Sequence, residues 1–301
     1  MEEKRYGGAF SGFHPLVNFL YFALVITGSM FFMHPVCLAI SLICSFLYSW
    51  KLTGRRAVRF NLIYLLPMML MAALLNPMFN HEGQTILAYL HTGNPLTLES
   101  IAYGVAAAVM LGAAVGWFSC FNAVMTSDKF IYLFGRVIPA LSLILAMVLR
   151  FVPKFKAQIK VISNAQRCIG RDVSNGSLMQ RAKHGLTILS IMVTWALENS
   201  IETADSMKSR GYGLPGRTAF SVFRFDGRDK AALAVIGGLG LYVFGGVMMG
   251  TMYWRYFPTM KGVSPGFFSA TTFAAYGGLC LTPVIIEFWE DRKWKLLQSN
   301  I

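Results

Sequence analysis

The chain has 301 residues, of which 55% are hydrophobic and only 14% are charged, and its mean hydropathy is +0.52. A soluble domain carries about a quarter charged residues, so this composition excludes an ordinary soluble globular protein and predicts a polytopic helical membrane protein. The net charge is +13, but the Lys and Arg residues gather beside apolar segments, as they do in the cytoplasmic loops of membrane proteins. No nucleic-acid-binding motif accompanies them, so we expect a lipid bilayer as partner and no nucleic acid.

Six apolar segments approach or exceed the ~20 residues that a helix needs to cross a bilayer. They are residues 17–33, 36–50, 62–79, 101–125, 231–254 and 267–288. The first is longer than the apolar core of a cleavable signal peptide, so we expect it to be retained as a span. The cluster Lys51, Arg55, Arg56 and Arg59 predicts a cytoplasmic loop, whereas residues 80–100 contain no Lys or Arg and are predicted to face outward.

Two spans carry residues with a defined meaning in membrane helices. Pro67 interrupts the third span, which membrane helices tolerate because neighbouring groups can satisfy the freed backbone carbonyl. Gly112 and Gly116 lie four residues apart in the fourth span, a spacing that favours close packing against another helix.

Residues 126–230 are predicted to be cytoplasmic because Lys and Arg recur throughout them. Residues 138–149 and 186–197 are strongly apolar but too short to span, so we expect buried or membrane-interface helices there. The chain thus divides into an N-terminal transmembrane region of about four spans (1–125), a cytoplasmic region (126–230) and a C-terminal region of about two spans (231–301) with a basic tail. The predicted fold class is all-α, with about six transmembrane helices, both termini cytoplasmic and a cytoplasmic pair of long helices.

The two long helices occupy the middle of the cytoplasmic region. The first is predicted to begin at Pro153, where a missing N–H costs little, and to end at Gly170. The second runs from about residue 178 to Gly211 and Gly213, which suit a left-handed helix stop. An ordinary amphipathic pair with a solvated basic face is the simpler interpretation. The shared ending, an Arg in the last turn followed by Gly, favours docking, because a guanidinium such as that of Arg210 can make a bidentate contact with a carboxylate.

Arg150 and Glu198 lie beside or within the apolar parts of these helices. An unpaired charge in such surroundings is unfavourable by several kcal/mol, so we hypothesise that the two pair and fix the crossing of the helices. The alternative is that Arg150 reaches the lipid headgroups.

Several motifs occur in a defined order along the chain. Residues 149–153 read Leu-Arg-Phe-Val-Pro, residues 165–167 read Ala-Gln-Arg, and Ala204 precedes Met-Lys-Ser-Arg-Gly-Tyr-Gly at residues 207–213. Residues 13–16 (Phe-His-Pro-Leu) and the tail at residues 294–297 and 299–301 complete the series. With these motifs the sequence resembles, over nearly its whole length, the T component of energy-coupling factor (ECF) transporters for vitamins and metals.

The resemblance implies a coupling scaffold with no chemistry of its own. In that family two coupling helices end in Ala-Arg-Gly motifs, each docking into a groove of one ATP-hydrolysing subunit, and the membrane spans hold a small substrate-binding S component. The expected partners are therefore two ECF ATPase subunits, either A and A' or a homodimer, and the S component. ATP and Mg²⁺ would be used by the ATPases, with no cofactor bound by this chain, and the protein would lie in the cell membrane of a prokaryote.

The resemblance also assigns candidate residues. Ser209, Arg210 and Gly211 match the second docking motif, with Ser in place of Ala. The first motif departs from the family, because Ile169 stands where the central Arg is expected, and Arg167 or Arg171 is expected to take over its contact. The first docking set is then Arg167, Cys168, Ile169, Gly170 and Arg171, and the residues expected to support the coupling helices are Arg150, Pro153, Ala165, Glu198 and Ala204.

Other chemistry finds little support in the sequence. The Walker A pattern G-x-x-x-x-G-K-[ST] is absent, so the chain is not predicted to bind ATP, and we expect neither catalytic nor metal-binding residues. His81 and Glu82 begin a zinc motif, but Thr85 stands at the place of its second His. The alternative function is a self-sufficient secondary transporter or permease, for which charges or paired broken helices inside the spans would be expected. An intramembrane enzyme would need a nucleophile and a base, and Ser119 has no evident His partner.

Overall fold

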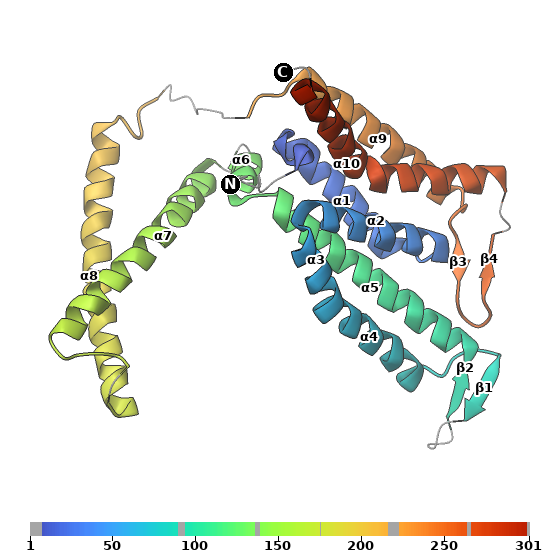
Figure 1. Cartoon of the computed structure of the whole chain (residues 1–301), viewed down its shortest axis with the longest axis horizontal. Coiled ribbons are helices and arrows are strands. Elements are labelled where there is room, and N and C mark those ends of the chain that lie inside the picture. The colour runs from blue at the N-terminus through green and yellow to red at the C-terminus, as the bar shows by residue number, and fades with distance from the viewer. Residues whose placement is uncertain are drawn as a thin grey trace. The chain divides into compact units, whose positions relative to one another are not determined.

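The computed structural model in Figure 1 describes residues 8–89, 94–135, 139–174, 176–215, 223–263 and 266–299. The charged lead at residues 2–5 and the last tail residues, Asn300 and Ile301, lie outside this part. By its internal contacts the chain divides into two compact units, Met1–Phe130 with Phe223–Ile301 and Ile131–Val222. We call the first the membrane unit and the second the helix-pair unit, and we describe each by itself.

The membrane unit contains six apolar helices and two short antiparallel hairpins in its described part. In chain order its elements are a 3-10 turn (Ala9–Gly12), α1 (Pro15–Phe31), α2 (Pro35–Thr53), α3 (Arg55–Phe60), a π turn (Asn61–Leu65), α4 (Leu66–Phe79), β1 (Ile86–Tyr89), β2 (Pro95–Thr97), α5 (Leu98–Val124), α9 (Gly227–Met248), β3 (Trp254–Arg255), β4 (Lys261–Gly262) and α10 (Phe267–Ser299). The helix α6 (Ser127–Gly135) follows α5 and leads into the helix-pair unit.

The six predicted spans correspond to helices of this unit. Among the described residues, five helices are long and apolar enough to cross a membrane, and Pro15–Phe31 is a shorter apolar helix. Figure 1 shows both hairpins at the same end of the bundle, where α4 meets α5 and α9 meets α10. The predicted fold class, an all-helical polytopic membrane protein, is confirmed.

Helices α1 and α2 begin with the same local device. His14 and His34 each precede a proline in the first turn, and their Nδ1 atoms accept the backbone N–H of Leu16 at 3.2 Å and of Val36 at 3.3 Å. The proline needs no partner, and the imidazole satisfies one of the N–H groups that a helix start leaves open. Because Nδ1 must be unprotonated to accept, the cap requires a neutral ring, and burial lowers the pKa of His14.

The third span passes Pro67 by means of a local π turn. Arg55–Phe79 is continuous, but within it the N–H of Leu66 bonds to the carbonyl of Asn61, five residues back. A wider turn accommodates a proline that cannot donate to the carbonyl four residues before it. The prediction that this span tolerates Pro67 is confirmed.

The core of the membrane unit is aromatic and joins four helices. The rings of Phe22 and Tyr21 on α1 lie 5.2 Å apart, and Phe22 lies 6.5 Å from Trp117 on α5. Trp117 donates to the hydroxyl of Ser41 on α2 at 3.0 Å, and the Tyr21 hydroxyl donates to the carbonyl of Cys280 on α10 at 3.1 Å. The indole nitrogen of Trp117 and the hydroxyl of Tyr21 therefore each have a hydrogen-bond partner on another helix, which specifies which helices pack together.

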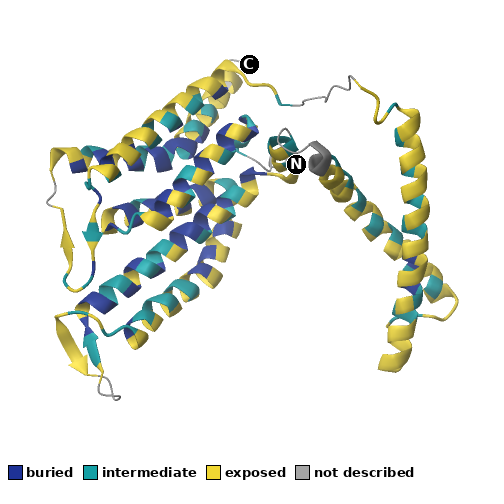
Figure 2. Ribbon diagram, turned by 180° about the vertical axis from the view of Figure 1, so that it is seen from behind, coloured by how far each residue is buried: buried dark blue, intermediate teal, exposed yellow. Residues whose placement is uncertain are grey.

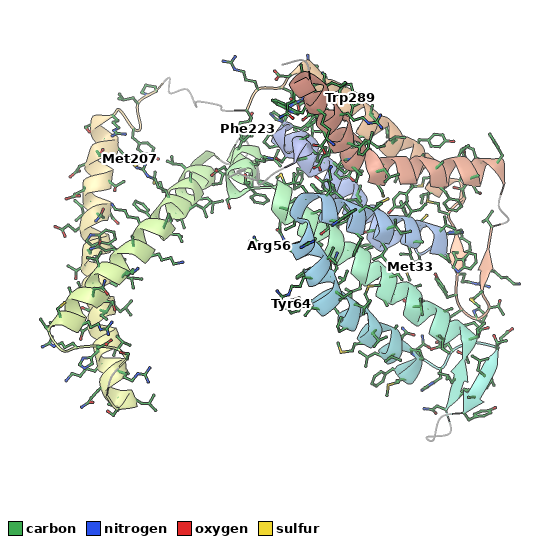
Figure 3. The ribbon with its side chains drawn as sticks, viewed as in Figure 1. Met33, Arg56, Tyr64, Met207, Phe223 and Trp289 are labelled. Atoms are coloured by element: carbon green, nitrogen blue, oxygen red, sulfur yellow. The ribbon has the colours of Figure 1, made fainter. Side chains whose placement is uncertain are left out.

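The hairpin β3–β4 is tied to the turn between α1 and α2. The Tyr256 hydroxyl donates to the carbonyl of Met33 at 2.9 Å, and Figure 3 shows Met33 at that end of the bundle. The ring of His34 lies 5.1 Å from that of Trp254 and 4.7 Å from that of Phe273. These contacts hold the loop between α9 and α10 against the bundle.

Glycines on α5 allow its neighbours to approach closely. A β-carbon at Gly104 would lie 2.8 Å from the backbone carbonyl oxygen of Ala73 on α4, and one at Gly116 would lie 2.7 Å from the Ser45 hydroxyl on α2. Gly112 faces the side chain of Met69 on α4. The predicted role of Gly112 and Gly116 in helix packing is confirmed, although they face different helices.

We predict that Gly104→Ala lowers the stability of the membrane unit by about 1–3 kcal/mol, because the new methyl group meets a backbone carbonyl that cannot turn away. Gly112→Ala is the matched control, since the flexible side chain of Met69 can move aside. Thermal unfolding of the protein in detergent measures both variants. Equal melting temperatures for the two would contradict the close approach at Gly104.

Candidate functional site

The helix-pair unit is built from α7 (Pro139–Cys168) and α8 (Leu178–Ser209). The predicted course of the second helix is confirmed, and a capping box starts it: Ser177 and Gln180 bond to each other's backbone N–H groups. The predicted start of the first helix at Pro153 is wrong, because α7 runs through that residue. Pro153 removes only one hydrogen bond, that to the carbonyl of Leu149, and the apolar residues before it form the earlier turns of the same helix.

The two helices cross in antiparallel fashion over a small core. Ile162 on α7 packs with Ile188 and Met192 on α8, and these three are the buried side chains of the cluster. The rings of Phe155 and Trp195 lie 5.5 Å apart in an edge-to-face contact. Elsewhere both helices are mostly exposed, as Figure 2 shows. In the described part of this unit, much of the apolar surface of the two helices therefore lies outside their shared core.

The structure does not bring Arg150 and Glu198 together, contrary to the hypothesis. The polar contact near the crossing is made by Lys154, whose amine donates to the amide oxygen of Asn199 and lies 5.3 Å from the centre of the Trp195 ring. The side chain of Asn199 faces α7. Successive residues of a helix point about 100° apart, so the side chain of the preceding residue, Glu198, points away from that face. Glu198 is exposed.

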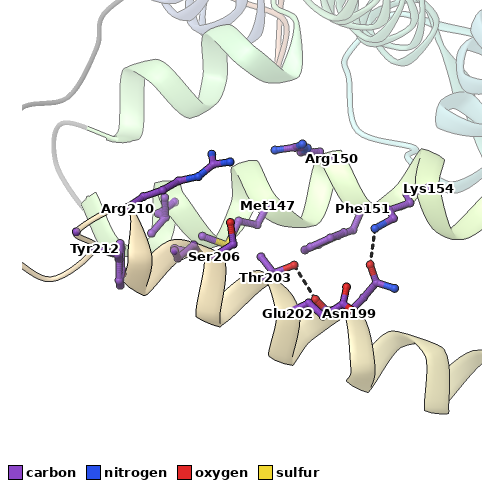
Figure 4. A pocket seen from close by; sticks show the side chains of 13 residues that line it. Met147, Arg150, Phe151, Lys154, Asn199, Glu202, Thr203, Ser206, Arg210 and Tyr212 are labelled. Atoms are coloured by element: carbon purple, nitrogen blue, oxygen red, sulfur yellow. Dashed lines mark hydrogen bonds between the residues drawn. The ribbon is translucent and has the colours of Figure 1, made fainter.

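A groove of about 820 Å³ opens between the first half of α7 and the last part of α8 (Figure 4). Arg150, Lys154 and Arg210 line it together with one acidic residue, Glu202. Its other lining residues are apolar or small polar: Leu143, Met147, Phe151, Asn199, Thr203, Ser206, Met207, Gly211 and Tyr212. Arg150, placed in the sequence as a support, therefore lies on the same groove as Arg210.

Helix α8 ends in a Schellman motif. The N–H of Tyr212 bonds to the carbonyl of Met207 at 3.0 Å, and the N–H of Gly211 bonds to the carbonyl of Lys208 at 3.0 Å. Gly211 has φ +81°, in the left-handed region, and Gly213 has φ +94°. The predicted glycine stop is confirmed. Arg210 is the residue at the C-cap.

Helix α7 ends in the same motif. The N–H of Arg171 bonds to the carbonyl of Gln166 at 2.9 Å, and the N–H of Gly170 bonds to the carbonyl of Arg167 at 3.0 Å, with φ +77° at Gly170. Position by position, Gly170 corresponds to Gly211 and Ile169 to Arg210. We call residues 167–171 the first tip and residues 208–212 the second tip.

The two tips differ in the side chain they present at the C-cap. Ile169 is 62% exposed, and Arg210 is exposed at the equivalent position. Arg167 and Arg171 each lie two residues from Ile169, on either side of it. Neither therefore takes the position that Arg210 has at the second tip.

The arginine before Ile169 has a local partner. Arg167 Nε lies 3.3 Å from the carboxylate of Asp172. The pKa of Asp172 is lowered, first because Ser174 donates hydrogen bonds to it and also because of Arg167. Cys168, beside them, is exposed, whereas Cys37, Cys44, Cys120 and Cys280 are buried.

The remaining residues assigned from the sequence lie along the helices. Ala165 is exposed in the last turn of α7, and Ala204 is exposed on α8 between the crossing and the second tip. Ser209 occupies the last helical position, where its hydroxyl donates to the carbonyl of Ser206 at 2.9 Å. In the described part of the chain, no group of three or more His, Cys, Asp or Glu side chains could hold a metal ion.

Two features of the site could not be read from the sequence. The groove depends on the crossing of α7 and α8, and the contact between Lys154 and Asn199 depends on the rotation of each helix about its axis. The equivalence of the tips did have a signal, since Gly170 and Gly211 each follow a helical run. What the sequence did not reveal is that both glycines close the same hydrogen-bond pattern.

These features define a class: a polytopic helical membrane protein whose membrane bundle is interrupted by a two-helix unit with glycine-stopped tips. The sequence model of the cobalt transport protein family (CbiQ) matches residues 13–220, more than half of the chain. The chain belongs to this family.

Its relatives carry names that agree with the resemblance seen in the sequence. The energy-coupling factor transporter transmembrane protein EcfT of Lactobacillus helveticus is 36% identical over 103 residues, which are 34% of this chain and 37% of the relative. The protein of that name from Leuconostoc gelidum subsp. gasicomitatum is 32% identical over 111 residues, 36% of this chain and 41% of the relative. The chain thus spans about two fifths of the length of the curated relatives it matches.

We predict that Trp195→Ala lowers the free energy of unfolding of the helix pair by about 2 kcal/mol. This is less than the ~3–5 kcal/mol expected for a fully buried Trp, because the indole is only half-buried. Leu197→Ala is the control, since Leu197 is 62% exposed on the same helix. Backbone hydrogen exchange of α7 and α8 reports the difference. If both variants exchange alike, the crossing does not depend on the contact between Trp195 and Phe155.

Proposed function

We propose that this chain is the transmembrane coupling component of an ECF-type importer. It would join two ATP-hydrolysing subunits to a substrate-binding S component held by its membrane helices. Membership of the CbiQ family and the names of its relatives support the type of transporter. The single observation that supports the coupling role most strongly is the pair of exposed tips with identical Schellman endings.

The second tip suits a carboxylate-bearing groove on a partner. If the last carbonyls of α8 lacked hydrogen-bond partners, Arg210 could be explained as a cation that stabilises the negative end of the helix dipole. Here the N–H groups of Gly211 and Tyr212 already satisfy the carbonyls of Lys208 and Met207, so capping does not require the Arg210 side chain. Its planar guanidinium can then serve a bidentate contact with a carboxylate.

The first tip presents Ile169 at the same position, so its contact would be apolar, with Arg167 and Arg171 placed to either side. An apolar tip and a cationic tip fit two different surfaces. This favours a pair of non-identical ATPases over a homodimer, and both docking sets, residues 167–171 and 209–211, remain part of the proposal.

In this mechanism the ATPases approach and separate as they bind and hydrolyse ATP, which moves the two tips relative to each other. The resulting motion would tilt or release the S component so that its substrate is delivered inward. The chain itself would carry no catalytic residue and bind no cofactor, since ATP and Mg²⁺ belong to the partners. We place it in the cell membrane of a prokaryote with both termini in the cytoplasm and keep the division into 1–125, 126–230 and 231–301 as part of this proposal.

We predict that Arg210→Glu lowers the amount of ATPase that co-purifies with the chain at least about tenfold, because truncating or reversing one partner of a buried charge pair is unfavourable by about 2–5 kcal/mol. Lys183→Glu is the control, because it makes the same charge change on an exposed residue at the other end of α8. Arg167 and Arg171 substitutions should each be milder. Wild-type levels of ATPase with Arg210→Glu would remove this residue from the docking site.

A further inference from the structure

The chain leaves the membrane unit after Phe130 and returns to it at Phe223. Both junctions contact one short stretch near the N-terminus, residues 8–18, which contains the 3-10 turn and the first turn of α1. We call this stretch the N-terminal clamp. All contacts described below lie within the membrane unit.

The leaving junction is held by Lys129 on α6, which is only 7% exposed. Its amine donates to the carbonyl of Ser11 at 2.5 Å and to that of Val124 at 2.9 Å. In the amide orientation that satisfies both of its neighbours, the Asn18 oxygen accepts from the Lys129 amine at 3.2 Å and the Asn18 nitrogen donates to the backbone carbonyl of Phe10 at 3.0 Å. The three N–H groups of the ammonium thus meet three neutral oxygens, two of them on the clamp.

Burial lowers the pKa of Lys129 to about 8, which leaves the amine protonated at neutral pH. A buried ammonium whose acceptors were withdrawn would be left unsatisfied, so the contact opposes any movement of α6 away from the clamp.

The returning junction is held by Asp229 in the first turn of α9, which is 5% exposed. One carboxylate oxygen accepts the backbone N–H of His14 at 3.0 Å, and the other accepts that of Asp226 at 3.0 Å. The ring of Phe225 lies 5.0 Å from the ring of His14 in an edge-to-face contact. One buried carboxylate therefore joins the start of α1 to the start of α9.

A second contact binds the returning junction to the clamp and to α10. The guanidinium of Arg228 lies 4.5 Å from the centre of the Phe13 ring and donates to Glu290 at 2.9 Å. Phe13 is itself 4% exposed and belongs to the aromatic core. The clamp therefore holds the leaving junction through the amine of Lys129, and the returning junction through a carboxylate, an aromatic ring and a guanidinium.

The clamp cannot yield independently of the bundle. Phe10 and Val17 are fully buried, and the Phe10 ring lies 5.2 Å from Tyr21 and 6.4 Å from Phe22 on α1. A close-packed core transmits displacement instead of absorbing it. A change in the separation of the two junctions must therefore either break these contacts or move α1.

We propose that the N-terminal clamp is the element through which movement of the helix-pair unit reaches the membrane helices, with Lys129 and Asp229 as its positioning residues. This rests on the proposed coupling function and adds to it a defined route. Both residues act through the clamp and contact neither nucleotide nor transported substrate.

The test uses the complex purified from cells with whatever ATPase subunits accompany the chain. Spin-labelled non-natural amino acids in place of Phe31 and Phe267 report the distance between the far end of α1 and the start of α10, and because they need no thiol chemistry, Cys168 in the first tip stays unaltered. Both positions are strongly exposed, at 76% and 88%. The measurement is the shift in this distance on adding ATP, together with the rate of ATP hydrolysis.

Lys129→Met and Asp229→Asn are expected to keep the ATPases and their hydrolysis but to lose most of the ATP-dependent shift. Lys230→Met and Asp128→Asn are the matched controls, since each makes the same chemical change on an exposed neighbouring residue, and they should keep the shift. Retention of the full shift in both clamp variants would overturn the proposal, as would loss of the assembled complex from both, because that would assign them a purely structural role. Absence of ATPases or of any shift from the unaltered complex would instead overturn the proposed function.

Discussion

The backbone groups at helix ends have no partner within their own helix, and in a chain of this kind each end needs a local solution. The structure depends on how these groups are satisfied. His14 and His34 cap α1 and α2, while Asp229 accepts the N–H groups at the start of α1 and near the start of α9. Where the helices of the helix-pair unit stop, glycines in the left-handed region close them.

The same constraint gives the tips their character. A Schellman ending satisfies the last carbonyls with backbone N–H groups alone, so the side chain at the C-cap is released from capping. At the second tip that side chain is Arg210, and at the first it is Ile169. The two tips thus share one backbone conformation but present different side chains. This arrangement is expected if one scaffold binds two similar but non-identical partners.

Much of the fold could be predicted from the sequence because its signals are local. Apolar length alone predicts the spans, and only glycine readily adopts the positive φ that ends α7 and α8. The predicted helix start at Pro153 was wrong because the preference of proline for the first helical position does not show whether the preceding residues are already helical. The pairing of Arg150 with Glu198 failed because it depends on helix rotation at a crossing, which spacing along the chain does not determine.

The N-terminal clamp could not be predicted from the sequence, because its contacts join residues that are far apart in the chain. Lys129 meets Ser11 across 118 positions of the chain, and Asp229 meets His14 across 215. Nothing in the local pattern distinguishes these two residues from exposed neighbours such as Asp128 and Lys230. Their role follows only from burial and from the convergence of both junctions on one stretch.

The native thiol of Cys168 offers the most direct test of docking at the tips, because it lies next to Ile169 and is exposed while the other four cysteines are buried. The rate of maleimide labelling of Cys168 can be measured in membranes with and without the ATPase subunits. Docking of the first tip in a partner groove predicts strong protection of Cys168 when the ATPases are present. An unchanged labelling rate would contradict the claim that both helix tips grip the ATPases.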